Sequence, residues 1–331
     1  MRVWAHMQQP SHLLGILLTV PNEDQRPHDY DSKTIDLYRR PSHTDRTYLE
    51  KYGIKASSGG GRSSPSARET IARVAAGAVA EKWLREAYGI EIAAFVSSVG
   101  NIKLFEDKAC FLELIDTLTR EKVDEFLPVR CPDTTAVKRM ENKIAELRDQ
   151  HDSTSGTVTC IIRGCLSGLG EPCFDKLEAL LAHAIISIPA TKGFKIGSGF
   201  RGAEMRGSRH NDPFVCLPPP LTMRRRALAL ESPLPVCRPR RTILAVSRAA
   251  SPTAWPFRVA FEPPATISQY QTAARYDASG EGVLAAKGRH DPNGAPRAVR
   301  IVEAMADLTI ADALMAQHAR QMGVKVAAAG R

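Results

Sequence analysis

A glycine-rich turn followed by a helix pattern carries the residue types best suited to binding an anion. Gly59–Gly61 allow a sharp turn and a close approach of the backbone to a ligand. One cation and two hydroxyls follow: Arg62, Ser63 and Ser64. Ser66 and Glu69 have the spacing of a capping box, so we expect a helix to begin here. Helix N–H groups and the helix dipole favour negative charge. The stretch therefore predicts either a phosphate site or an ordinary loop with a capped helix.

The elements that position this turn alternate between strand and helix patterns. Strand patterns cover Ile16–Val20 and Glu91–Val99, and Asp152–Arg163 begins as a turn and continues as a strand. Helix patterns cover Asp107–Arg148, Cys173–Ile188 and Val299–Gln321. The first helical stretch is broken at Cys131-Pro132-Asp133, and Asp133 or Thr134 caps the helix that follows. With 331 residues, 43% of them hydrophobic, the chain can bury a large core. We expect an α+β fold.

The net charge of +9 comes mainly from one segment. Leu217–Trp255 holds seven Arg and seven Pro but a single acid, Glu231, and shows neither a helix nor a strand period. The rest of the chain is close to neutral. No aromatic residues are interleaved with the Arg cluster to stack on bases, so we expect no nucleic-acid partner.

The cysteine pattern and the N-terminal stretch indicate a cytoplasmic protein. Seven Cys occur without a C-x-x-C motif or a His at zinc-ligand spacing, which favours reduced thiols and no metal site. The apolar run Leu13–Val20 is too short to span a membrane, and the residues before it form a poor signal peptide. We expect no membrane association.

Four long stretches resemble the chorismate synthase family, in the family's order. They are Asn22–Gly53 (NEDQRPHDY…RPSHTDRTYLEKYG), Gly59–Leu84 (GGGRSSPSARETIARVAAGA…), Gly168–Gly207 (GLGEPCFDKLEALLAHAIISIPATKGFKIGSGF…MRG) and Phe257–Met305 (FRVAFEPPATI…AAKGRHDP…PRAVRIVEAM). The resemblance implies one domain over residues 1–331. The fold it implies is a β-α-β sandwich of two antiparallel sheets enclosed by helices, assembled as a homotetramer.

The activity implied by this resemblance is the conversion of 5-enolpyruvylshikimate-3-phosphate to chorismate and phosphate, with reduced FMN as cofactor. The hydrogen and the phosphate leave from opposite faces without net redox change. Fungal-type members also reduce their own FMN with NADPH, and the insert Asp107–Arg148 resembles that eukaryotic branch.

The resemblance also assigns site residues. His43 and Asp291 match the family's catalytic histidine and the carboxylate proposed to deprotonate the flavin N5. Judged from the residues alone, His43 is a solvated loop histidine and Asp291 a turn or helix cap. The positions implied to hold FMN are Arg62, Ser63, Ser64, Pro189, Ala190, Pro263, Pro264, Ala265, Thr266 and Arg289.

Several positions depart from the family pattern. Two residues are inserted near Pro65, Ser155 stands where the family usually has Gly, and Glu262 stands in the position of a Lys. The stretch Asn293-Gly294-Ala295 replaces Cys-Val-Val, and Arg46 replaces a Tyr beside His43. The leader motifs T-F-G-E-S-H-G and R-R-R-P-G are not found, so we expect the family's N-terminal leader to be lacking.

A shift of the reading frame would explain the composition of the Arg-rich segment. Arg240–Trp255 can be encoded so that the same bases, read one base earlier, give TTNNSGGIQGGISNGM, the family's glycine-rich flavin loop. We therefore expect Leu217–Trp255 to be that loop translated out of frame and disordered. Two interpretations remain open: an FMN-dependent lyase, or a non-catalytic remnant or assembly partner of the same family.

Overall fold

The computed structural model describes the chain in segments that include all of the central sheet and the helices that cover it. The described residues are 4–6, 17–21, 45–53, 65–104, 114–115, 117–166, 168–210, 214–216, 237–239, 255–265, 267, 269–274, 281–284 and 291–329.

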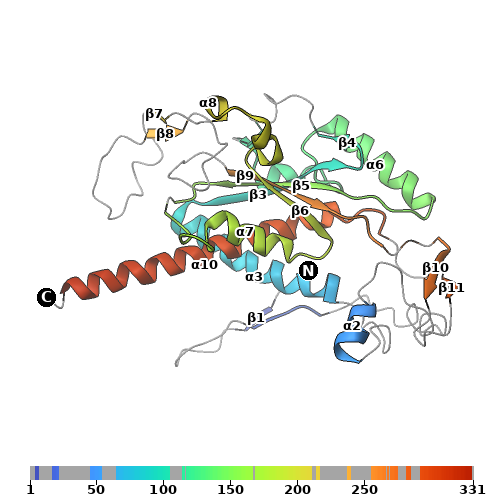
Figure 1. Ribbon diagram of the computed structural model, residues 1–331, viewed down its shortest axis with the longest axis horizontal. Helices are drawn as coiled ribbons and strands as arrows, with labels where there is room; N and C mark the ends of the chain where they lie inside the picture. Colours follow the sequence, from blue (N-terminus) through green and yellow to red (C-terminus); the bar gives the residue numbers. More distant parts are fainter. Residues whose placement is uncertain are drawn as a thin grey trace.

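A five-stranded antiparallel sheet forms the centre of the molecule, with the strand order β4-β3-β5-β9-β6. Its strands are β3 (Glu91–Val99), β4 (Ile102–Lys103), β5 (Gly156–Arg163), β6 (Thr191–Ile196) and β9 (Trp255–Phe261). Both faces of β3 are buried, as its nearly continuous apolar run requires. The sheet and its covering helices confirm the α+β class (Figure 1).

Register in the sheet depends on a glycine at the start of β5. A Cβ atom on Gly156 would lie 1.9 Å from the carbonyl oxygen of Ser98, so no larger residue fits there. A bulge lies between Val96 and Ser98, and the hydroxyl groups of Ser97 and Ser98 both hydrogen-bond to Thr157 Oγ1 at 2.8 Å.

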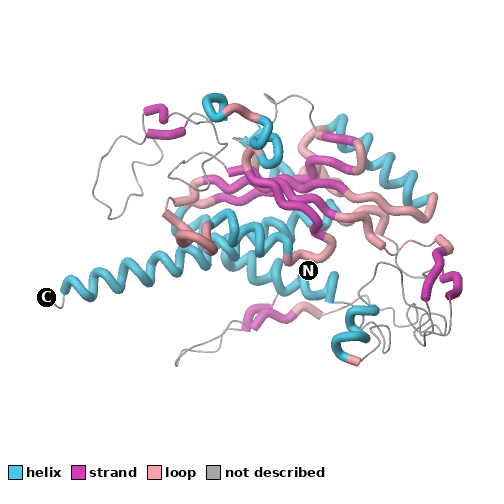
Figure 2. Tube along the Cα trace, in the orientation of Figure 1, coloured by secondary structure: helices cyan, strands magenta, loops and turns pink. Residues whose placement is uncertain are grey.

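Three helices cover one face of the sheet: α3 (Pro65–Tyr88), α7 (Leu177–Ile186) and α10 (Ala295–Ala329) (Figures 1 and 2). The predicted helix after the glycine-rich turn is thus confirmed, but it begins at Pro65, where a missing N–H costs least, so Ser66 lies inside the helix and not at its N-cap. Helix α6 (Thr134–Asp149) contacts β4, and its N-cap is Asp133, which accepts a hydrogen bond from Ala136 N at 2.6 Å. None of the described helices combines the length and apolarity needed to cross a membrane.

The remaining described elements are short. They are α2 (Asp45–Tyr52), α5 (Arg120–Asp124), η2 (Gly199–Glu204), α8 (Gly207–His210) and three two-stranded pairs: β1–β2 (Trp4–His6, Leu17–Thr19), β7–β8 (Phe214–Cys216, Cys237–Pro239) and β10–β11 (Gln271–Ala274, Glu281–Leu284). Within the Arg-rich segment, only β8 and Trp255, the buried first residue of β9, belong to the described residues.

Helix α10 carries two buried acids into the layer between sheet and helices. Glu303 is fully buried and accepts hydrogen bonds from Ala94 N at 2.8 Å and Arg300 Nη1 at 2.6 Å. Asp307 lies one turn further along, and burial, followed by the charge of Glu303, raises its pKa to about 8. Glu303 thereby joins α10 to the middle of β3.

Helices α3 and α10 approach each other closely at Gly77 of α3. A Cβ atom there would lie 2.4 Å from Ala304 Cβ and 2.6 Å from Ala304 Cα on α10. We expect Gly77→Ala to lower the free energy of unfolding by about 1–3 kcal/mol, because the overlap outweighs the better helix propensity of Ala. Gly323→Ala, on α10 but with nothing within 4 Å of its added Cβ, is the matched control and should be neutral or stabilising. Equal urea midpoints for the two variants would contradict this account of the helix crossing.

Candidate functional site

Six of the twelve predicted site residues belong to the described part of the chain. They are Pro189, Ala190, Pro263, Pro264, Ala265 and Asp291. The other six lie outside the described residues: His43, Arg62, Ser63, Ser64, Thr266 and Arg289. The six described residues come from three segments that are far apart in sequence.

Two of these segments meet where β6 begins and β9 ends. Thr191 pairs with Phe261 in the register of the two strands, and Glu262 N donates to Ala190 O at 2.8 Å just beyond the last pair. Ala190 has φ +63°, a left-handed conformation that costs about 1–2 kcal/mol for a residue with a Cβ. Such strain persists only where neighbouring contacts fix the backbone, as the Glu262 hydrogen bond does here.

The connection before β5 brings in the third segment. Ser153 Oγ donates to Pro264 O at 2.8 Å, and the next residue, Thr154, donates from its backbone N to Pro292 O at the same distance. Asp291 is the neighbour of Pro292. One short connection therefore holds the residues after β9 beside the residues that precede α10.

Asp291 is paired with a cation on the first turn of α10. Its Oδ2 lies 2.9 Å from Nη1 of Arg297, and about one third of the Asp291 side chain is exposed. Asn293 accepts from Ala295 N through its Oδ1 at 2.8 Å and so caps the helix. The carboxylate of Asp291 is thus held at the start of α10 with one oxygen engaged.

Arg73 of α3 contacts Ser187, the residue that follows the last turn of α7. Its guanidinium donates to Ser187 Oγ at 2.7 Å and to Ser187 O at 3.2 Å, two residues before Pro189. It also pairs with Glu69 at 3.0 Å, on the same helix. The third turn of α3 is therefore connected to Ser187, two residues before Pro189.

Comparisons with known proteins show the family to which the chain belongs. The family model for chorismate synthase matches residues 12–315. The chain is 59% identical over 322 residues to the chorismate synthase of Neurospora crassa, covering 93% of this chain and 74% of that protein. It is 50% identical over 313 residues to that of Saccharomyces cerevisiae, covering 94% and 79%. The chain belongs to the chorismate synthase family. A crystal structure of a chorismate synthase is similar with a TM-score of 0.58 and 26% identity, over 76% of this chain and 65% of that one.

The negative charge of Glu262, a position where the resemblance implies a lysine, is compensated by a neighbouring lysine. Glu262 Oε2 lies 3.4 Å from Nζ of Lys192, two residues after Ala190. The position where the resemblance implies a lysine therefore holds an acid with a neighbouring base. Because both side chains are about half exposed or more, this pair contributes little to stability.

Two other departures leave buried polar atoms without partners in the described structure. Ser155 Oγ and Asn293 Nδ2 are buried and make no hydrogen bond. The family resemblance implies another residue at both positions, Gly and Cys respectively, so each substitution adds a polar side-chain group here. Leaving such a group unsatisfied costs about 1–3 kcal/mol.

Thr191 Oγ1 is a third buried hydroxyl with no partner among the described residues, directly after Ala190. Thr191, Arg73, Ser153 and Thr154 were not predicted as site residues from the sequence. Of these four residues, only Thr191 could have been suspected from the sequence, because it directly follows the predicted Pro189–Ala190 pair.

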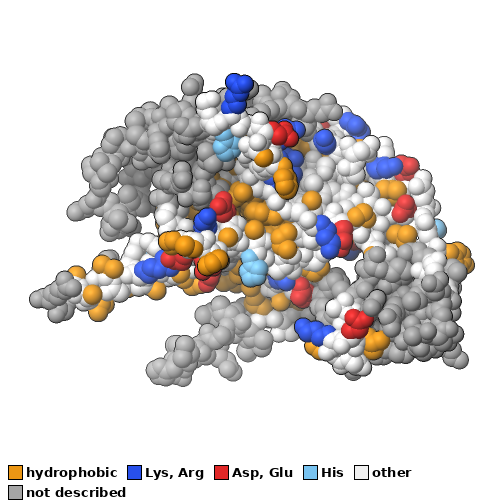
Figure 3. All heavy atoms as spheres, viewed as in Figure 1, with side chains coloured by type: hydrophobic (Ala, Val, Ile, Leu, Met, Phe, Trp, Pro, Cys, Tyr) orange, Lys and Arg blue, Asp and Glu red, His pale blue; other side chains and the backbone are white. Residues whose placement is uncertain are grey.

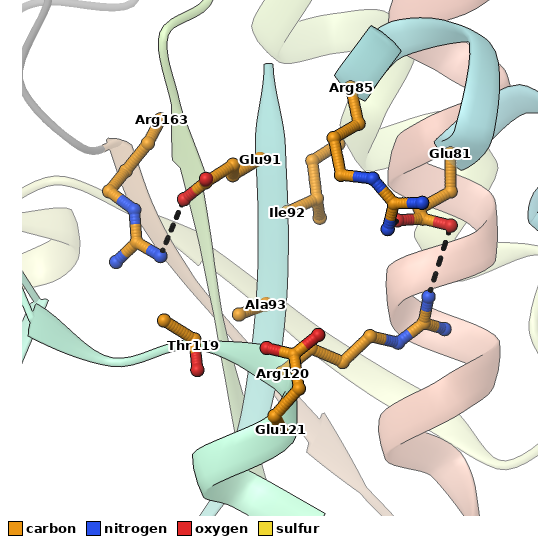
Figure 4. Close-up of a pocket in the computed structure, with 9 residues that line it drawn as sticks. All are labelled: Glu81, Arg85, Glu91, Ile92, Ala93, Thr119, Arg120, Glu121 and Arg163. Atoms are coloured by element: carbon orange, nitrogen blue, oxygen red, sulfur yellow. Dashed lines mark hydrogen bonds and ion pairs between the residues drawn. The ribbon is translucent and has the colours of Figure 1, made fainter. Parts of the chain in front are cut away.

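A separate pocket lies at the opposite end of the sheet, where β3 begins and β5 ends (Figure 4). Its charged side chains compensate one another: Arg163 lies 3.2 Å from Glu91, and Arg120 lies 3.5 Å from Glu81. It contains none of the described site residues. The pocket is lined by Glu81, Arg85, Glu91, Ile92, Ala93, Thr119, Arg120, Glu121 and Arg163.

The three buried cysteines offer no alternative chemistry. Burial raises the pKa of Cys131 and of Cys165 to about 12, and raises that of Cys160, so these thiols stay protonated near neutral pH. Among the residues that the structure describes, no group of His, Cys, Asp and Glu is arranged to hold a metal ion.

Proposed function

We propose that the chain converts 5-enolpyruvylshikimate-3-phosphate to chorismate and phosphate with reduced FMN. The observation that carries this proposal is the meeting of three segments at one end of the sheet, held by the hydrogen bonds Glu262 N to Ala190 O, Ser153 Oγ to Pro264 O and Thr154 N to Pro292 O. These segments carry the six described residues that the family resemblance assigns to the site. Family membership favours the enzyme over the non-catalytic remnant that the sequence left open.

The described residues at this end fit a flavin in composition. Pro189, Ala190, Pro263, Pro264 and Ala265 present small or apolar groups suited to pack against a ring system, and the Thr191 hydroxyl beside them has no partner in the described structure. When bound, reduced FMN supplies electron density as the phosphate departs and recovers it as the proton leaves.

The charged residues take separate roles in this proposal. As the family resemblance implies, Asp291 would accept the proton of the flavin N5, which leaves that nitrogen able to take the substrate proton, and Arg297 orients the Asp291 carboxylate. His43 holds a proton near the flavin, since its ordinary pKa lies near neutrality. The phosphate groups of cofactor and substrate are bound by Arg62 and Arg289 with the hydroxyl groups of Ser63, Ser64 and Thr266, because guanidinium groups bind phosphate through paired hydrogen bonds.

Four finer features complete the proposal. The chain reduces its own FMN with NADPH, it assembles as a homotetramer, it works in the cytoplasm, and residues 1–331 form one domain interrupted by the out-of-frame segment Leu217–Trp255. The charged, mostly helical region within Asp107–Arg148 supports the first feature, by its resemblance to fungal members.

The test is an anaerobic assay of the purified chain with 5-enolpyruvylshikimate-3-phosphate, in which the flavin source is varied. We expect chorismate with chemically reduced FMN and none without flavin. Chorismate formed from oxidised FMN and NADPH alone would support the reductase activity. Chorismate formed with reduced FMN, but not with oxidised FMN and NADPH, would support the lyase activity and contradict the proposed flavin reductase activity. No product under any condition would contradict the proposed function.

A further inference from the structure

One arginine on α3 contacts α10 and the C-cap residue of α7. Arg73 donates from Nη1 to Ser187 Oγ at 2.7 Å and from Nη2 to Ser187 O at 3.2 Å, just after the end of α7. Its Nη1 also lies 3.6 Å from Met305 Sδ on α10. Glu69, one turn before Arg73 on α3, pairs with its Nη2 at 3.0 Å and orients it. These contacts hold the guanidinium group between α3, α7 and α10.

Arg73 supplies a permanent positive charge that α7 lacks. Helix α7 contains neither Lys nor Arg, and hydrophobic side chains gather over it on the face shown in Figure 3. Its C-cap is Ser187, whose hydroxyl donates to Ala184 O at 2.6 Å and accepts from Arg73. A cation at this end is favoured, because the last carbonyl groups of a helix carry partial negative charge. Arg73 thus fixes the residue at which α7 ends and the next turn begins.

The turn that follows α7 is held at its other end by the residue after β9. Glu262 N donates to Ala190 O at 2.8 Å. Ala190 has φ +63°, a conformation that a residue with a Cβ keeps only where its surroundings impose it. Ile188 is buried, so the turn cannot move outward without exposing an apolar side chain. We call residues 187–190 the clamped turn, because Arg73 holds its first residue and Glu262 holds its last.

We propose that Arg73 is a positioning residue for the cofactor, which holds the clamped turn in the left-handed form that packs against FMN. This inference rests on the proposed function, in which Pro189 and Ala190 line the flavin. Backbone strain of this kind concentrates at ligand-binding sites. The apparent affinity for a ligand falls in proportion to the fraction of molecules that have the binding conformation. Loss of Arg73 frees one end of the clamped turn, so this fraction, and with it the affinity for FMN, decreases.

The experiment titrates the full chain with oxidised FMN and follows the quenching of flavin fluorescence. We expect Arg73→Gln to raise the Kd of FMN about ten-fold, because a left-handed alanine loses one of its two anchors. Arg73→Lys keeps the charge at the end of α7 but lacks the planar fork that donates to both Ser187 oxygens, so we expect a rise of about three-fold. With saturating reduced FMN, the KM for 5-enolpyruvylshikimate-3-phosphate should change by less than about two-fold in either variant.

A second substitution separates positioning of the turn from a general loss of stability. Ala190→Gly removes the cost of the left-handed conformation, since glycine adopts it freely. In the Ala190→Gly background, Arg73→Gln should therefore raise the Kd of FMN by less than about three-fold. A merely structural role of Arg73 predicts the same factor in both backgrounds, and that result would overturn the inference.

Arg85→Gln is the matched control. Arg85 also lies on α3 and pairs at 2.5 Å with an acid one turn before it, Glu81, but it is about three turns further along the helix than Arg73. Its substitution should leave the Kd of FMN unchanged. A Kd that Arg73→Gln does not change, or that Arg85→Gln raises equally, overturns this inference and leaves the proposed function standing. Failure of the unmodified chain to bind FMN contradicts the proposed function, and this inference with it.

Discussion

Replacing Asp291 by Asn is expected to lower kcat for chorismate formation by about 100-fold or more, with a much smaller change in the KM for the substrate. The amide keeps the size of the side chain but removes the carboxylate proposed to accept the proton of the flavin N5. General-base catalysis of this kind contributes a factor of about 100 to 10,000 to the rate. The fold should remain intact, because Asp291 is partly exposed and its partner Arg297 is mostly exposed. Steady-state kinetics together with a urea unfolding curve measure both quantities.

The control for this variant is Arg297→Gln. It removes the partner of Asp291 but keeps the carboxylate, so we expect less than a ten-fold loss in kcat, in keeping with the small energy of exposed ion pairs. If Asp291→Asn retains the activity of the unmodified chain, Asp291 is not the base. If both variants lose activity equally, the ion pair rather than the carboxylate is what matters.

Replacing Glu303 by Ala is expected to lower the free energy of unfolding by about 3–5 kcal/mol, as is usual when one partner is removed from a buried charge pair. Glu303 is fully buried, and its Oε2 lies 2.6 Å from Arg300 Nη1 and 3.1 Å from Arg120 Nη2. Its loss also leaves the backbone N–H of Ala94 without an acceptor in the middle of β3. Arg300 keeps its contact with Asp124, which limits the loss.

Glu86→Ala is the matched control for Glu303→Ala. Glu86 is exposed on α3, so the same change of residue type there should alter the free energy of unfolding by less than about 0.5 kcal/mol. Urea denaturation followed by tryptophan fluorescence measures both variants. A Glu303→Ala variant as stable as Glu86→Ala would show that the buried network does not hold α10 to the sheet.

Local sequence patterns predicted the elements that are defined by their own residues. The strand Glu91–Val99 has the expected bounds, and Asp133 caps α6 as one of the two predicted caps. The helix predicted from Cys173 begins only at Leu177, because Cys173 has φ +70° and Glu171 N bonds to Asp175 O in a tight turn. Helix α10 begins before the predicted Val299, since Asn293 bonds to Ala295 N and a Pro at position 296 is tolerated in a first turn.

The periodicity of hydrophobic residues could not predict contacts between residues that are far apart in the sequence. The hydrogen bonds from Glu262 to Ala190 and from Thr154 to Pro292 join residues more than 70 positions apart, and nothing in the local sequence around them names the partner. The same holds for Glu303, whose acidic type predicts a solvated position on a helix rather than a buried one. The site assignments came from family resemblance, and the structure adds the contacts that bring three of the segments together.

The most direct test of family function in this chain is the stoichiometry of its reaction. Purified chain, a catalytic amount of reduced FMN and excess 5-enolpyruvylshikimate-3-phosphate are incubated without oxygen, and chorismate and phosphate are quantified together. We predict that the two products form in equal amounts, in many-fold excess over FMN, because the elimination involves no net redox change. Absence of chorismate, or phosphate release without it, would contradict the account.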